Sequence, residues 1–372
     1  MRLGHLNLPL LRRPAAAAAL SLACSVVAAA PLDALLSAAP VDDAGKGELE
    51  LSYDMVNDSV DFLHLRSSGS GGPTSTTTAN PKPGDYKGFH ARGAYSIGDA
   101  WRIDGSAWHR SLDYRSFNAD VLSWQLGAQY RWLDGGTSSP SGAIRLSAWG
   151  NRAPDMRKST STTIEGIKFS SATVTRPRDM QLQADAIGTW PLRQHLALNG
   201  FAGIGVGRVD FDHVSATSKQ KGCEYQVDFG PDLIVATCNS GGQQITLSAP
   251  PSAYGINVDK EAKYDSRYLH FGGSVQWRSG PWRARAGYQY LRMNRTNVDD
   301  ILVRRGETPY KSNNVFIVDG GYQVTAHVML FARGQLMRNQ FGGEIPMAYN
   351  TVSARRFNQR YGILSLGLNI SF

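Results

Sequence analysis

Segments in which apolar and polar side chains alternate, most of them 10–14 residues long, recur from about residue 48 to the C-terminus. In residues 124–132 (WQLGAQYRW) every second residue is apolar or aromatic, and residues 282–290 and 364–372 repeat the pattern. Successive side chains of a strand point to opposite faces, so each segment predicts a strand with one apolar and one polar face. Strands of soluble sheets have about 5–6 residues. A tilted strand that crosses a bilayer needs about 9–11, and most of these segments are long enough.

Twelve such strands are predicted, at 48–55, 86–97, 101–110, 120–133, 143–152, 179–190, 195–211, 264–277, 282–293, 313–324, 327–338 and 359–372. The connections alternate between short turns and longer loops, of which 212–263 is the longest. Transmembrane barrels have short periplasmic turns and long extracellular loops. The sequence therefore predicts an all-β fold, a transmembrane antiparallel up-and-down β-barrel of about 12 strands with both termini on the periplasmic side.

Aromatic residues stand at the strand ends next to the predicted short turns. They are Trp101, Trp132, Trp190, Trp277, Trp282 and Phe372. An aromatic girdle at a membrane interface produces this placement. A soluble β-protein would instead bury its rings in the middle of its strands.

The first residues have the pattern of a signal peptide. Arg12 and Arg13 precede an apolar stretch from Ala15 to Ala30, and we expect cleavage after Ala29. The predicted organisation is a signal peptide at 1–29, a short periplasmic segment at 30–47 that is too short for a wide plug domain, and the barrel at 48–372. Residues 1–29 hold three arginines and no acidic residue, so their removal lowers the net charge from +8 to +5. Charge this mild and scattered does not favour nucleic acid as a partner.

The last strand, YGILSLGLNISF at 361–372, alternates apolar residues and ends in phenylalanine. In this it resembles the assembly signal of the outer-membrane β-barrels of Gram-negative bacteria, and the resemblance extends over residues 48–372. It implies export to the periplasm, insertion by the barrel-assembly machinery, and an outer membrane whose lipid and lipopolysaccharide surround the protein.

Charged residues on the polar faces of the strands are expected to point into the lumen. They are Glu48, Glu50, Asp54, Arg92, Arg102, Asp104, Arg110, Arg131, Arg145, Asp185, Arg283, Arg285, Asp319 and Arg333. The leading hypothesis is a passive channel for small anionic solutes whose basic constriction is formed by Arg102, Arg131, Arg145, Arg283 and Arg285, because rings of arginine select for anions. The alternative is an interior closed by salt bridges, because an unpaired buried arginine is costly.

Loop 212–263 contains two short apolar stretches, 224–229 and 233–237, on either side of Gly230-Pro231. They predict a small hairpin with Cys223 opposite Cys238. In an oxidising compartment such a pair forms a disulfide. The stiff hairpin could project outward for binding or fold into the mouth of the barrel.

Two further functions remain open. The first is a closed structural or adhesive surface barrel that acts through loops 56–85 and 212–263. The second is a hydrolase at the outer rim, with candidates His109, Asp113, Asp210, Asp212 and His213, although their spacing matches no known motif. The sequence indicates no cofactor and no metal site.

Overall fold

A computed structural model gives the fold of the chain. It describes residues 33–38, 47–56, 85–114, 117–136, 138–158, 162–164, 167–220, 223–240, 243–254, 257–338, 345–351, 354 and 360–372. The predicted signal peptide and most of the predicted loop 56–85 lie outside these residues. No helix in the described part of the chain is long and apolar enough to cross a membrane.

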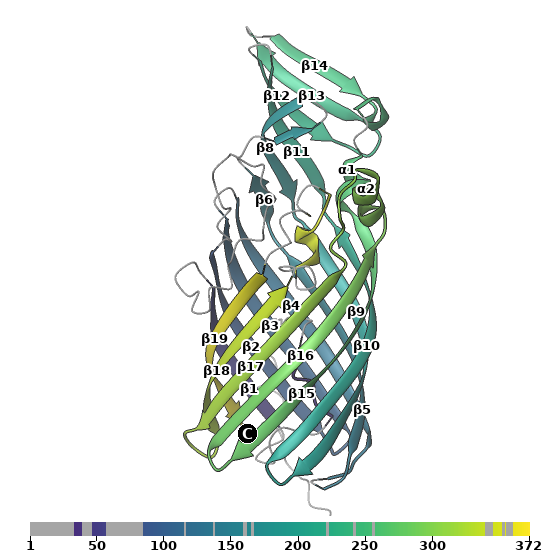
Figure 1. Cartoon of the computed structure of the whole chain (residues 1–372). Coiled ribbons are helices and arrows are strands. Elements are labelled where there is room, and N and C mark those ends of the chain that lie inside the picture. The colour runs from purple at the N-terminus through teal and green to yellow at the C-terminus, as the bar shows by residue number, and fades with distance from the viewer. Residues whose placement is uncertain are drawn as a thin grey trace, which may run out of the picture.

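Twelve long strands form a closed antiparallel barrel, as the alternation predicts (Figure 1). Each begins and ends within four residues of its predicted bounds. The hydrogen bonds between β1 and β19 close the barrel, with Glu48 facing Ser371. The strands are β1 (Gly47–Val56), β2 (Asp85–Ile97), β3 (Trp101–Tyr114), β4 (Phe117–Leu133), β5 (Ser141–Arg152), β9 (Arg178–Arg193), β10 (Leu196–Asp210), β15 (Tyr264–Ser279), β16 (Trp282–Arg295), β17 (Ser312–Gln323), β18 (Val328–Arg338) and β19 (Arg360–Ser371).

The barrel wall is apolar outside and polar inside. Along β4, Leu126 is exposed on the outer surface, whereas its neighbours Gln125 and Gln129 are buried in the interior. All six aromatic residues of the predicted girdle are exposed at the end of the barrel that carries the short turns. A broad apolar outer surface with an aromatic rim is what a strand-built membrane protein presents to lipid.

A second sheet stands above the opposite end of the barrel (Figure 1). Its strands are β6 (Asp155–Lys158), β7 (Thr162–Ile164), β8 (Ile167–Thr175), β11 (His213–Gln220), β12 (Cys223–Phe229), β13 (Ile234–Ser240) and β14 (Gln243–Ala249). We call it the extracellular sheet. Strands β6, β8 and β11 continue the barrel strands β5, β9 and β10 after breaks of two residues, so the sheet is an outward extension of one side of the wall.

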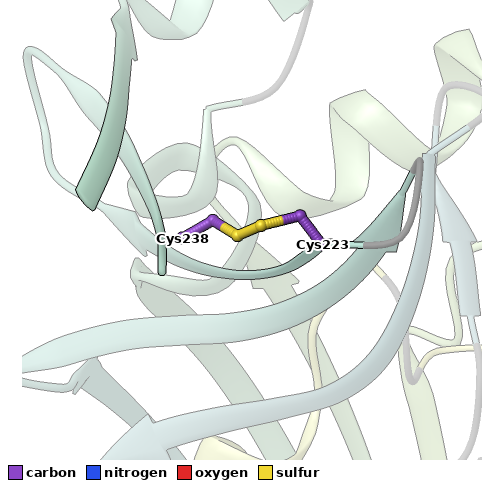
Figure 2. Close-up of a disulfide and its surroundings, with 2 residues drawn as sticks. All are labelled: Cys223 and Cys238. Carbon is purple, nitrogen blue, oxygen red and sulfur yellow. A yellow bond between two sulfur atoms is a disulfide. The ribbon is translucent and has the colours of Figure 1, made fainter. Parts of the chain in front are cut away.

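The predicted hairpin is present as β12 and β13, and a disulfide joins Cys223 to Cys238 (Figure 2). The predicted register is wrong by two residues. The turn contains residues 230–233, closed by a hydrogen bond from the Gly230 N–H to the Leu233 carbonyl, and Gln226 faces Thr237. The two cysteines therefore lie diagonally, with Cα atoms 6.3 Å apart, a spacing that a disulfide spans.

Helical segments pack inside the extracellular end of the lumen. Helix α2 (Val298–Arg304) and the 3-10 helix η3 (Pro346–Ala348) bring Val298, Leu302 and Met347 against inward-facing residues of β16, β17 and β18, such as Met293. These side chains are buried and belong to one apolar cluster, the apolar cap. Two shorter segments, η2 (Pro251–Tyr254) and α1 (Val258–Ala262), connect β14 to β15.

Candidate functional site in the lumen

The N-terminal segment 33–38 lies inside the barrel, which differs from the predicted periplasmic position of residues 30–47. Asp33 forms an ion pair with Arg92 at 3.1 Å. The Ala38 N–H donates to the Thr189 hydroxyl at 2.9 Å, and Gln129 donates to the Ser37 carbonyl at 3.1 Å. Leu36 and Ala38 pack on Ala143, Ile187 and Phe201 of the wall. A polar lumen with one apolar patch suits this mixed segment better than water does, because both kinds of side chain find partners there.

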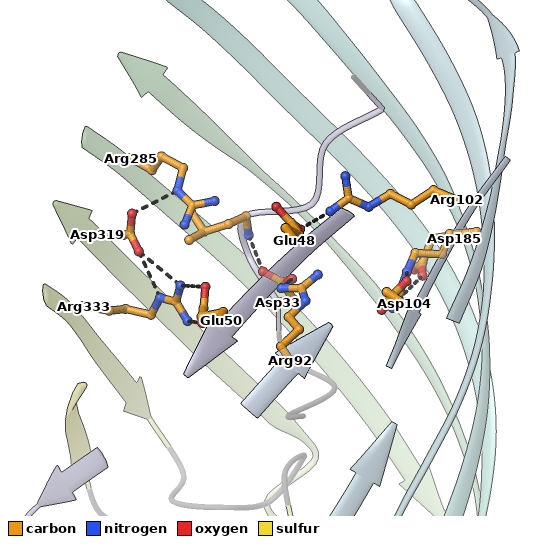
Figure 3. A network of polar contacts seen from close by, with 12 residues as sticks. Asp33, Glu48, Glu50, Arg92, Arg102, Asp104, Asp185, Arg285, Asp319 and Arg333 are labelled. Atoms are coloured by element: carbon orange, nitrogen blue, oxygen red, sulfur yellow. Dashed lines mark hydrogen bonds and ion pairs between the residues drawn. The ribbon is translucent and has the colours of Figure 1, made fainter. Parts of the chain in front are cut away.

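One half of the lumen is occupied by a cluster of ion pairs around Asp319 (Figure 3). Its carboxylate accepts a hydrogen bond from Arg285 at 3.0 Å and one from Arg333 at 3.2 Å, and Arg283 lies 3.7 Å away. Arg333 also donates a hydrogen bond from each terminal nitrogen to Glu50, at 2.9 and 3.0 Å. A guanidinium held in this two-pronged way is fixed in orientation as well as neutralised.

The other half contains a second cluster. Arg145 is 2.7 Å from Asp104 and 3.9 Å from Asp185, and Arg102 is paired with Glu48. Both clusters appear in Figure 3. Arg131 lies apart from them, at the short-turn rim, where it pairs with Asp134 at 3.4 Å.

Four of the five arginines predicted to form a constriction therefore line one cavity, and Arg131 does not. The cavity has a volume of about 120 Å³, and Asp33, Glu48, Glu50 and Asp104 line it as well. This volume holds several water molecules. It is well below the 300–1,000 Å³ of typical small-molecule sites. Each of the four arginines lies within 4 Å of a carboxylate: Arg102 of Glu48, Arg145 of Asp104, and Arg283 and Arg285 of Asp319. These pairs agree with the alternative of a salt-bridged interior.

The glycines of β10 that face inward do not leave space. A Cβ atom at Gly203 would meet Asp185 and His270, one at Gly205 would meet the Tyr268 ring, and one at Gly207 would meet Gln181. Neighbouring side chains occupy the room that these glycines leave, so close packing, rather than a wider lumen, explains them.

The residues considered for a rim hydrolase do not converge on one site. His213 pairs with Asp228 of β12 at 3.0 Å, and Asp212 is paired with Arg176 and Arg178. Asp210 accepts from Arg178 at 2.8 Å and lies 3.3 Å from Lys263. His109 faces the outer surface of the wall, and the side chain of Asp113 lies outside the described residues. Carboxylates engaged by arginine and lysine are held as ion pairs and not next to a nucleophile.

Sequence reasoning identified the inward-facing charges but missed Asp33 and the role of Arg333. The signal for Asp33 was weak: an acid followed by the apolar pair Leu35-Leu36, in a segment expected to lie in water. Arg333 had the required inward position, but its partner Glu50 is 283 residues away in the chain.

No family model and no curated protein sequence matches the chain. Solved structures with a similar arrangement include the translocator domain of the autotransporter NalP from Neisseria meningitidis, with 12% identity, a TM-score of 0.46, and coverage of 89% of this chain and 90% of that one. The beta domain of the Bordetella autotransporter BrkA has 9% identity, a TM-score of 0.43, and coverage of 89% and 100%. The CymD monoaromatic hydrocarbon channel has 11% identity, a TM-score of 0.36, and coverage of 88% and 90%. The fold itself is established by the chain's own closed twelve-stranded barrel.

Proposed function

We propose that this protein is a closed outer-membrane barrel that anchors the extracellular sheet, and that the sheet contacts a partner which contributes an extended strand. The filled lumen carries the proposal. Segment 33–38 and the two ion-pair clusters line one cavity in the part of the lumen nearer the short turns, and the apolar cap occupies the extracellular end. Such a barrel is an anchor, so the exposed sheet is the surface available for function.

Strand β14 supports contact with a partner. It forms one edge of the extracellular sheet, so its outer backbone groups are not paired within that sheet. Ile245 and Leu247 are 41% and 52% exposed and lie on one face of the strand. An exposed edge with apolar side chains is a template to which another strand can be added.

Electrical recording tests the closed lumen. The full mature chain in a planar bilayer with asymmetric KCl is expected to give no stepwise current. A steady current with an anion-selective reversal potential would contradict the closed lumen and favour a channel, the second candidate, which the four arginines around one cavity support. A variant that lacks residues 33–38 is the matched comparison. It is expected to stay closed because the apolar cap remains, and a current in this variant alone would make the segment a gate.

A pair of substitutions on β14 tests the edge. Ile245→Lys with Leu247→Lys is expected to abolish attachment of producing cells to protein-coated surfaces and to each other, because it removes the apolar side chains against which those of an added strand would pack. Gln244→Lys with Thr246→Lys adds the same charge to the other face of the same strand. Equal loss in both variants would assign the effect to charge alone, and no loss in either would remove β14 from the proposal.

A further inference from the structure

A cleft of about 470 Å³ lies on the outer surface of the barrel wall, where the wall meets the extracellular sheet. His109, Arg152, Arg176 and Arg178 supply nitrogen donors, Leu122 and Pro154 supply apolar surface, and the carboxylate of Asp120 lies in the lining as well. The cleft is separate from the lumen and from β14, and the closed-barrel proposal does not use it.

The height of the cleft on the wall coincides with the outer edge of the apolar belt. On β9, the outward-facing residues run from Trp190 in the aromatic girdle to Met180, and both are exposed. Ten residues span about 33 Å along a strand. That length corresponds to about 25 Å across the membrane at a tilt of about 40°, the height of the apolar band in such barrels. The next outward residue after Met180 is Arg178, so the cleft begins at the level of lipid headgroups.

Carboxylates pair with two of the three arginines of the cleft, and Arg152 is the one without an ion pair among the described residues. Arg152 faces Arg178 directly across the β5–β9 ladder. Arg178 is paired with Asp210 and Asp212, and its hydrogen bond to Asp212 keeps the pKa of that carboxyl below its ordinary value, so the pair stays ionised at neutral pH. Arg152 is exposed and forms no ion pair within the described residues. Like charges directly opposite each other are unfavourable, and an anion between them removes the repulsion.

We propose that this cleft binds the phosphate group of a phosphorylated lipid in the outer leaflet, with Arg152 as its main contact. A guanidinium suits phosphate because its N–H groups donate in pairs. The apolar part of the cleft adjoins the lipid-facing surface below it, because Leu122 precedes the outward-facing Trp124 and Leu126 on β4. A free anion would use only the arginines, whereas an amphiphile uses both surfaces.

Native mass spectrometry of the purified full chain in detergent tests the proposal, with lipid A as the probe. Arg152→Gln is expected to weaken lipid A binding about tenfold, the loss of one charge-assisted contact. Arg267→Gln is the matched control, because Arg267 is another exposed, outward-facing arginine, on β15 beyond β9 and β10. It is expected to leave the affinity unchanged. Equal weakening by both variants would mean diffuse attraction and overturn the site, as would no weakening by Arg152→Gln.

Two further arms keep the test decisive if Arg152→Gln folds poorly. Dephosphorylated lipid A is expected to bind the unaltered protein about as weakly as lipid A binds the variant, and Arg152→Lys is expected to retain part of the affinity. Inorganic phosphate at millimolar concentration is expected not to displace the lipid. Displacement by phosphate, or full binding of the dephosphorylated lipid, would exclude a lipid-phosphate site.

Discussion

The barrel wall and the extracellular sheet are both antiparallel and both alternate apolar with polar residues, yet they are inverted relative to each other. In the wall, Leu126 is 62% exposed and its neighbour Gln125 is 5% exposed. In the sheet, Val227 is 8% exposed, whereas its neighbour Gln226 is exposed. The same alternation therefore places apolar side chains on the lipid-facing surface of the wall and polar side chains on the water-facing surface of the sheet. The medium around a strand, and not the pattern within it, decides which face is buried.

The largest expected effect concerns the ion pairs inside the wall. Asp319→Asn removes the carboxylate shared by Arg285 and Arg333. Arg333 keeps Glu50, but the buried charge of Arg285 loses its ion-pair partner. We expect a loss of about 3–5 kcal/mol in the free energy of unfolding, measured by urea unfolding in detergent micelles with tryptophan fluorescence. Arg208→Gln breaks an exposed pair with Asp265 on the outside of the wall and is the control, with no measurable change expected. Equal losses of unfolding free energy in the two variants would mean that the ion pairs of the interior are as well solvated as those of the surface.

The inversion itself is tested by one charge placed on each kind of exposed face. Leu126→Arg puts a guanidinium on the lipid-facing surface and is expected to cost about 2–4 kcal/mol in unfolding free energy if the residue lies near the bilayer midplane. Gln226→Arg makes the same addition to the exposed polar face of the extracellular sheet and is expected to cost less than about 0.5 kcal/mol. Unfolding from lipid bilayers by urea measures both. A tolerated Leu126→Arg would show that this surface does not meet lipid.

The disulfide is expected to stabilise only the extracellular sheet and not the barrel. It closes a separation of 15 residues, for which the chain-entropy model gives about 3 kcal/mol. Cys223→Ser with Cys238→Ser should therefore raise the rate of proteolysis within 213–249 on intact cells, while the unfolding midpoint of the barrel stays unchanged. A lower midpoint for the barrel would mean that the two sheets unfold as one unit.

The twelve barrel strands were predictable because alternation is a local property that each segment carries in its own sequence. The inward position of Arg145, Arg285 and Asp319 followed from their parity alone. The shorter strands β6, β7, β8, β11 and β14 were not predicted, because the region was interpreted as loop and a strand of three to nine residues in a polar region gives little signal. The hairpin β12–β13 was predicted, but its turn proved two residues longer than expected.

The sequence by itself determined the number of barrel strands, the face that each strand turns to the lumen, and the pairing of two cysteines, because all three depend on neighbours close in the chain. Only the tertiary structure decided which arginine meets which carboxylate in the lumen, and that segment 33–38 lies among them. Those contacts depend on the closure and stagger of the barrel, which bring Glu50 and Arg333 together from opposite ends of the chain. An ion pair between residues so far apart in the chain cannot be predicted from a local sequence pattern.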